Sequence, residues 1–235
     1  MNKPLIIAMD FKDKQSANAF LTSFGNEKLF LKVGMELFYR EGPALVEEWK
    51  VAGHQLFLDL KLHDIPNTVK AAARQLASLQ VDLMTVHASG GIKMMEAARE
   101  GLASGANNNS PDCIAVTQLT STSEQMMKNE LAIDKSLQDT VIHYADNAKQ
   151  AGLQGVVCSA HEAPYIKQHV SSDFACVTPG IRLSNNSADD QKRVVTPGEA
   201  SERGSDAIVV GRSITRADNP YQQYNEIKKQ WRNET

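Results

Sequence analysis

Three charged residues interrupt an apolar stretch of the sequence near position 60. Residues 56–69 read LFLDLKLHDIPNTV, so that Asp59, Lys61 and Asp64 follow directly on a run of leucine and phenylalanine. Unpaired charge is costly in an apolar environment, whereas carboxylates and an ammonium group that neutralise one another are tolerated in a pocket with little water. A nearby carboxylate also favours the charged form of a lysine. Lys61 is therefore a candidate proton donor, with Asp59 and Asp64 as its charged partners.

Further polar residues stand at the ends of other apolar runs. Asp10 ends the first run, Lys32 lies within the second, and Thr120 follows the fifth. Each charged residue has a plainer interpretation in isolation, namely Asp10 as a turn or cap residue, Lys32 on a solvated face, and Asp64 as a helix cap. His87 ends the fourth run, and we interpret it as a core histidine. Taken together, the charges exceed what one structural ion pair would explain.

A second polar group indicates anion binding. Gly211 and Arg212 follow the last apolar run, where backbone amides, the start of a helix and a guanidinium group can hold a phosphate. Arg182 and Gln191 belong to a long polar segment, residues 178–193. This segment is typical either of a lid over the same phosphate or of a mobile surface loop. Together, these four residues predict that the protein binds a ligand with a phosphate group.

Composition excludes several classes of protein. The net charge is −3 and the basic residues are scattered, so nothing predicts a nucleic-acid or membrane surface. No apolar run has the length of a membrane span or a signal peptide. The histidines show no metal-binding spacing, so no metal is expected. Cys113, Cys158 and Cys176 lie in apolar runs without a CxxC spacing, which predicts reduced thiols in a cytoplasmic protein.

The apolar runs predict the elements that position these residues. Eight short, β-branched runs are typical of buried strands, and they cover residues 5–10, 29–34, 55–60, 82–87, 114–119, 155–159, 176–181 and 207–211. Segments with helical spacing lie between and after them, at residues 13–24, 43–53, 69–80, 93–104, 133–151, 162–170, 196–204 and 219–231. Strands and helices that alternate in this way indicate a (β/α)8 TIM barrel of the α/β class.

A doubly wound open sheet is the alternative fold, because periodicity alone does not show that a sheet closes. No shift in composition and no linker divides the chain, so residues 1–235 are expected to form a single domain. In a barrel the chemistry lies at the C-terminal ends of the strands. The polar residues described above are therefore expected to gather around one mouth.

The motif around Lys61 resembles that of a known family. DLKLHDIPNT, residues 59–68, matches the D-x-K-x-x-D-I-P-x-T pattern of orotidine 5′-phosphate decarboxylases, and the chain is similar to the bacterial type over essentially its whole length. The flanking segments MDF, LKVGMELF, VTQLTS, VTPGIR and IVVGRSIT carry the same resemblance.

The resemblance implies a reaction and its catalytic residues. The reaction is decarboxylation of orotidine 5′-monophosphate to UMP and CO2, the last step of de novo UMP synthesis, by a homodimer without a metal or organic cofactor. Lys61 would protonate C6 of the pyrimidine, and Asp59 would lie against the substrate carboxylate. Lys32 would bridge the charge network and the ribose, while Asp64 would enter from the partner subunit.

The resemblance also implies the residues that bind the substrate. Asp10 would bind ribose hydroxyls, as would Thr68 from the partner subunit, and Thr120 would contact the pyrimidine. The residues that would hold the phosphate are Arg182, Gln191, Gly211 and Arg212.

Two other functions are alternatives. Magnesium-dependent sugar-phosphate decarboxylases or lyases of similar barrel architecture share the D-x-K-x-x-D strand and stabilise an enediolate with the metal. The continuation HDIPNT, residues 63–68, favours the nucleotide enzyme. A catalytically silent phosphate-binding barrel is the second alternative, and the complete charged set argues against it because a binding protein has no need of a proton donor.

Overall fold

The strands of the protein close on themselves. The structure, a computed structural model, describes residues 3–107, 109–183 and 194–234. These residues form parallel strands that each pair with the next along the chain, and β1 pairs with β8. The strands are β1 (Leu5–Ala8), β2 (Phe30–Gly34), β3 (Gln55–Leu62), β4 (Leu83–His87), β5 (Asp112–Val116), β6 (Gly155–Val157), β7 (Ala175–Thr178) and β8 (Ala207–Val210). The predicted (β/α)8 barrel is confirmed, and the open-sheet alternative is wrong.

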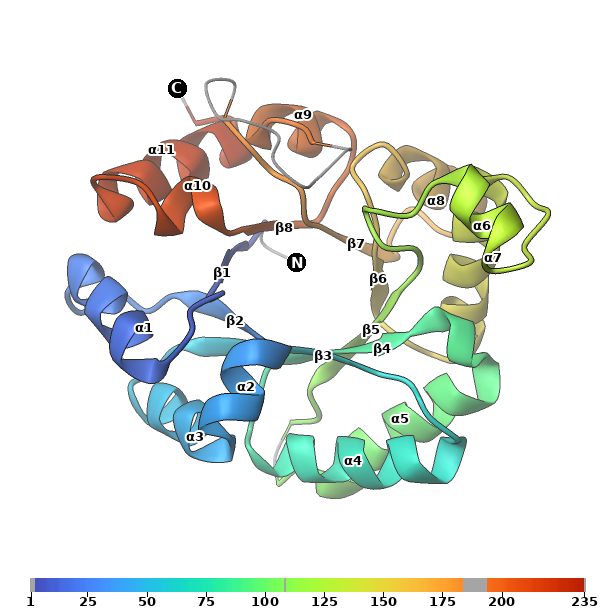
Figure 1. Cartoon of the computed structure of the whole chain (residues 1–235), viewed down its shortest axis with the longest axis horizontal. Coiled ribbons are helices and arrows are strands. Elements are labelled where there is room, and N and C mark those ends of the chain that lie inside the picture. The colour runs from blue at the N-terminus through green and yellow to red at the C-terminus, as the bar shows by residue number, and fades with distance from the viewer. Residues whose placement is uncertain (1–2, 108, 184–193, 235) are drawn as a thin grey trace.

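Helices surround the barrel, as Figure 1 shows. They are α1 (Lys14–Leu21), α2 (Met35–Glu41), α3 (Pro43–Val51), α4 (Pro66–Ser78), α5 (Ile92–Gly105), α6 (Glu124–Asn129), α7 (Leu137–Gln150), α8 (Ala163–His169), α9 (Pro197–Glu202), α10 (Arg212–Thr215) and α11 (Pro220–Arg232), with 3-10 turns at Thr22–Phe24 and Ala88–Gly90. Each predicted helical segment overlaps one of these helices. The sequence pattern did not predict the short helices α2, α6 and α10.

The start of α7 differs from the prediction. The i+4 repeat began at Ile133, but the helix begins at Leu137. The side chain of Ser136 accepts a hydrogen bond from the backbone N–H of Asp139 (3.0 Å), and this cap starts the helix. The apolar spacing therefore placed the start of this helix about one turn too early.

Alternating side chains of the strands build two apolar layers. Those that point into the barrel form an inner cluster, and those that point outward pack against the helices. The inner cluster consists of Ile6, Ala8, Phe57, Leu83, Ile114, Val177, Ala207 and Val209. The barrel interior is therefore a packed core rather than a channel, and a ligand has room only at its ends.

Four strands end two or three residues earlier than the sequence predicts. β1 ends at Ala8, β5 at Val116, β6 at Val157 and β7 at Thr178, whereas the apolar runs extend to residues 10, 119, 159 and 181. The residues that follow, among them Asp10 and Thr120, leave the sheet and line a cavity at the C-terminal end of the barrel. Hydrophobicity marked these segments as buried, but their burial comes from the loops above the barrel.

Helix α4, which follows the charged motif of residues 59–68, packs very closely against α5. A Cβ atom added at Gly101 of α5 would lie 2.3 Å from Lys70 O, and one at Gly105 would lie 2.1 Å from Arg74 O. No side chain fits at either position, so the two glycines allow the helix backbones to approach. This contact fixes α4 and, with it, the segment that joins α4 to β3.

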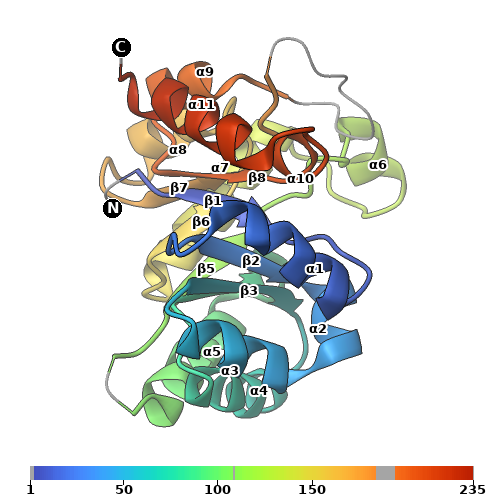
Figure 2. The ribbon, with the colours of Figure 1, turned by 90° about the vertical axis from the view of Figure 1, so that its left-hand side faces the viewer.

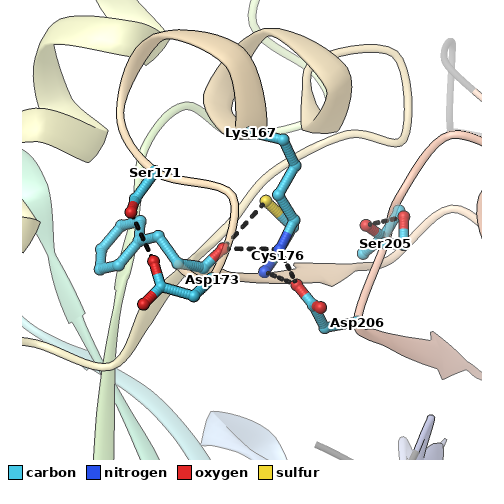
Figure 3. Close-up of polar contacts among 8 residues, drawn as sticks. Lys167, Ser171, Asp173, Cys176, Ser205 and Asp206 are labelled. Carbon is cyan, nitrogen blue, oxygen red and sulfur yellow. Dashed lines mark hydrogen bonds and ion pairs between the residues drawn. The ribbon is translucent and has the colours of Figure 1, made fainter.

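Side chains at the opposite end of the barrel cap the strand starts. Asp206 precedes β8, and its Oδ2 accepts hydrogen bonds from the N–H of Cys176 in β7 and from Lys167 Nζ of α8, both at 2.7 Å (Figure 3). Asp82 makes the same pair of contacts before β4, with Leu56 N and Lys50 Nζ, again at 2.7 Å. These carboxylates tie helix, strand and neighbouring strand together.

Figure 2 shows both ends of the described chain on one side of the molecule. Trp231 of α11 is buried there and donates a hydrogen bond from Nε1 to Lys3 O (2.8 Å). Among the described residues, no helix is both long and apolar enough to cross a membrane.

Candidate active site

A cavity of about 230 Å³ lies at the C-terminal end of the barrel. Its floor is apolar, with Phe57, Val116, Val157 and Val209, and its walls come from the ends of β1, β2, β3, β5, β7 and β8. The structure brings most of the predicted site residues together in these walls, namely Asp10, Lys32, Asp59, Lys61, Thr120, Arg182, Gly211 and Arg212.

The charged residues of the cavity form one connected network. Lys61 Nζ lies 2.9 Å from Asp59 Oδ1, and Lys32 Nζ lies 3.6 Å from Asp59 Oδ2 and 3.2 Å from Asp10 Oδ1. The side chains of Asp59 and Lys32 are only 13% and 12% exposed, whereas that of Asp10 is 65% exposed. Lysines and carboxylates alternate, so each buried charge has a partner of opposite sign.

Asp59 is held in its charged form. Burial acts to raise the pKa of this carboxyl, but the charges of Lys32 and Lys61 and hydrogen bonds from Lys61 and Thr85 outweigh it. The pKa of Asp59 therefore lies below its ordinary value. The cavity consequently contains a fixed negative charge beside an ammonium group at neutral pH.

The backbone at Lys61 departs from a regular strand. Asp59 and Lys61 point into the cavity, as their spacing predicts, but Lys61 has a φ of +53°, in the left-handed region that non-glycine residues rarely adopt. Its backbone N–H donates to Thr85 Oγ1 of β4 (3.0 Å), and Thr85 Oγ1 donates to Asp59 Oδ1 (3.0 Å). Thr85 was missed by sequence reasoning because a threonine inside an apolar strand looks like an ordinary core residue.

Two walls of the cavity carry the predicted phosphate-binding groups. The loop after β7 contributes Gly180 and Arg182, and Gly211 and Arg212 follow β8. Arg182 is buried, and its Nη1 donates to the backbone carbonyl of Ile181 (2.9 Å). Gln191, the fourth predicted contact, lies outside the described residues.

Asp64 and Thr68 do not line the cavity of their own chain. Both are exposed, at the end of β3 and in the first turn of α4. Asp64 Oδ1 accepts a hydrogen bond from the backbone N–H of Ile65 (2.7 Å). Ile65 and not Asp64 is the N-cap residue of α4, so the interpretation of Asp64 as the cap of this helix is wrong.

His87 is half-buried rather than enclosed in the core. Its ring lies 5.5 Å, centre to centre, from that of His63, and burial, His63 and Lys61 lower its pKa. The interpretation as a core histidine is therefore wrong in part, since this ring borders the charged network. A lowered pKa keeps the ring neutral at pH 7.

The structure adds several residues to the predicted lining, namely Gln118, Leu119, Cys158, Pro179 and Gly180. These residues lie at the ends of predicted strands, and this location was the one signal in the sequence that they line the cavity. Cys158 is buried, and a hydrogen bond with Cys176 together with burial raises its pKa well above the ordinary value. This thiol is therefore neutral and is no nucleophile.

Within the described residues, His, Cys, Asp and Glu side chains do not gather in groups of three or more that could hold a metal ion. In the cavity, Lys32 contacts both Asp10 and Asp59, so that an ammonium group already neutralises the two carboxylates.

Comparison with known proteins supplies the family. Residues 3–227 match the Orotidine 5'-phosphate decarboxylase / HUMPS family. The chain belongs to this family. Two relatives named orotidine 5'-phosphate decarboxylase come from Geobacillus sp. (strain WCH70), 56% identical over 100% of this chain and 99% of the relative, and from Bacillus cereus (strain AH820), 57% identical over 98% of each. A solved family structure, that of orotidine 5'-phosphate decarboxylase from Lactobacillus acidophilus, is 40% identical and superposes with a TM-score of 0.89 over 97% of this chain and 99% of that one.

Proposed function

We propose that the protein converts orotidine 5′-monophosphate to UMP and CO2. The observation that carries this proposal is the alternating network of Lys32, Asp59 and Lys61 in the cavity of a chain whose relatives bear that name over their full length. The sugar-phosphate alternative has no observation in its favour.

The chemistry explains why the cavity needs these charges. Loss of CO2 from C6 leaves an electron pair in the plane of the pyrimidine ring, where the π system cannot delocalise it. Charge from the protein must stabilise this carbanion. Lys61 supplies an ammonium group beside it and then a proton, and the carboxylate of Asp59 keeps that ammonium group in place at 2.9 Å.

Repulsion between Asp59 and the substrate carboxylate is a minor contribution. Two like charges about 4 Å apart interact by roughly 4 kcal/mol at an effective dielectric constant near 20. A very slow reaction needs its barrier lowered by about 20 kcal/mol. The larger share therefore comes from charge that stabilises the transition state and from binding energy at the remote phosphate.

The remaining cavity residues are proposed to bind the substrate. Asp10 is largely exposed at the mouth and contacts Lys32, which suits binding of ribose hydroxyls. Thr120 is half-buried in the wall beyond β5 and is proposed to contact the pyrimidine. The phosphate is assigned to Arg182, Gln191, Gly211 and Arg212.

We also propose a homodimer in which each cavity is completed by Asp64 and Thr68 of the partner subunit. Both residues face solvent in the single chain, so another surface is needed to bring them to a cavity. Large apolar side chains are exposed nearby at the same end of the barrel, with Ile65 67% exposed and Tyr39 of α2 72% exposed. Exposed apolar groups of this size favour association.

A cytoplasmic location and a single domain complete the proposal. Cys113, Cys158 and Cys176 are all buried and unpaired, which fits a reducing compartment. Pairing of β1 with β8 joins the two ends of the chain in one sheet, which supports one domain over residues 1–235.

The proposed function is tested by the ultraviolet absorbance of orotidine 5′-monophosphate incubated with the purified protein. We expect the orotate band to disappear at a rate that EDTA does not change. An unchanged spectrum with folded protein would refute the activity. Loss of the band that EDTA abolishes would instead favour the magnesium-dependent alternative.

A further inference from the structure

Strand β3 is longer than its neighbour β4 over the stretch that carries the catalytic charges. The register between them shifts between Leu58 and Leu62, where residues 59–61 lie opposite the single residue Thr85. A bulge of this kind leaves ladder groups without their usual backbone partners. The backbone N–H of Lys61 is such a group, and a side chain satisfies it.

The hydroxyl of Thr85 makes two hydrogen bonds whose direction is determined. It accepts from the N–H of Lys61 (3.0 Å), which can only donate. Its single proton is then directed to Asp59 Oδ1, also at 3.0 Å. Thr85 is completely buried, so water does not compete for either bond.

We propose that Thr85 is the positioning residue of this active site, which holds the strained backbone of Lys61 and the carboxylate of Asp59 in one arrangement. This inference rests on the proposed decarboxylation and adds a residue to it. Thr85 does not appear in the described lining of the cavity, so it acts through its neighbours rather than on the substrate. Without the hydroxyl, the unfavourable left-handed conformation of Lys61 loses its hydrogen bond to β4.

The same hydroxyl helps to keep Asp59 ionised. Asp59 Oδ1 accepts from both Thr85 and Lys61 Nζ, and Lys32 of β2 faces the other oxygen. His87 from the end of β4 also interacts with Asp59 and lies beside His63, and Asp10 contacts Lys32. Loss of the Thr85 bond removes one group that favours the carboxylate, so the pKa of Asp59 rises.

The test compares three substitutions at one site. Thr85→Val keeps the shape of the side chain but removes the hydroxyl, Thr85→Ser keeps the hydroxyl, and Thr85→Ala serves if the valine variant does not fold. Thr178→Val is the matched control, because Thr178 is equally buried and its hydroxyl lies 2.8 Å from that of Ser205, a neutral partner.

Two measurements are made on each folded variant. We expect Thr85→Val to lower kcat by roughly 10- to 100-fold, as a misplacement of about 1 Å does, with KM for orotidine 5′-monophosphate little changed. In the pH profile of kcat/KM, the acid limb of Thr85→Val should move to higher pH. A 13C NMR titration of the Asp59 carboxyl, which needs no activity, should show the same rise in pKa. Thr85→Ser and Thr178→Val should behave like the wild type in both measurements.

An Asp59 titration that is unchanged in Thr85→Val or Thr85→Ala would overturn the proposal, whether or not the protein decarboxylates the substrate. Equal loss of activity in Thr85→Ser would also overturn it, since the hydroxyl would then not be the group that matters. An inactive wild type would refute the proposed function alone, because the titration would still report on Thr85.

Discussion

The charges of the cavity depend on one another. Lys32 contacts both Asp10 and Asp59, and Asp59 also contacts Lys61, so removal of one member changes the charge balance around the others. Substitutions in this network are therefore expected to be non-additive. We propose that Lys61 is the member with a chemical role of its own, in which its ammonium group both stabilises and protonates the carbanion.

Lys61→Ala should abolish turnover while it leaves binding of UMP within about tenfold of the wild type. Binding survives because the groups assigned to the ribose and the phosphate remain. The measurements are decarboxylation by ultraviolet absorbance and UMP affinity by calorimetry. Lys70→Ala is the control, because Lys70 is exposed and pairs with Glu100 on the surface (2.7 Å). Near-normal kcat in Lys61→Ala would show that another group protonates C6.

The carboxylates that cap strands and the charged residues of the cavity lie at opposite ends of the barrel. The C-terminal ends carry the charged network, whereas at the N-terminal ends Asp82 and Asp206 cap neighbouring strands. In this barrel the second set is expected to affect stability without affecting the reaction.

Asp206→Ala should lower the free energy of unfolding by about 1–3 kcal/mol, because the N–H of Cys176 and the ammonium group of Lys167 lose an acceptor. Urea denaturation measures this loss. The neighbouring Asp173 is exposed and bonded to Ser171 (Figure 3), so Asp173→Ala should change the stability by less than about 0.5 kcal/mol. A lower kcat in folded Asp206→Ala would contradict the separation of the two ends.

Whether one chain is sufficient for activity depends on whether its cavity is complete without a second subunit. The cavity of a single chain contains Asp10, Lys32, Asp59 and Lys61 but lacks Asp64, which faces solvent. A two-fold dimer would place Asp64 of each subunit in the cavity of the other.

This arrangement predicts complementation between inactive variants. Lys61→Ala and Asp64→Ala should each be nearly inactive alone, but exchange of subunits at equal concentrations should restore about a quarter of the wild-type activity. Half of the dimers are then mixed, and each mixed dimer has one intact site. A mixture of Lys61→Ala with Asp59→Ala is the control and should stay inactive, because both residues serve the same cavity. Failure of the first mixture, with subunit exchange confirmed by mass spectrometry, would argue against Asp64 acting in trans.

Local patterns were sufficient to predict most of the elements. Short apolar runs predicted all the strands of the barrel because buried parallel strands need continuous hydrophobic sequence. They failed where burial has another source: the runs after β1 and β7 continue into loops over the cavity, and Ile133 lies before the cap of α7. Hydrophobicity records burial but not whether a segment stays in the sheet.

The sequence by itself determined the strand and helix order, the residues at the strand ends, and the motif that indicates the family. These are local properties of neighbouring residues. Only the tertiary structure decided that β1 pairs with β8, that Lys32 lies between Asp10 and Asp59, and that Asp64 is exposed and does not line the cavity of its own chain. The contacts of Thr85 were also visible only in the tertiary structure, because its two hydrogen bonds reach across to β3 at a bulge. Such contacts depend on register and closure, and these are set by the packing of residues far apart in the chain.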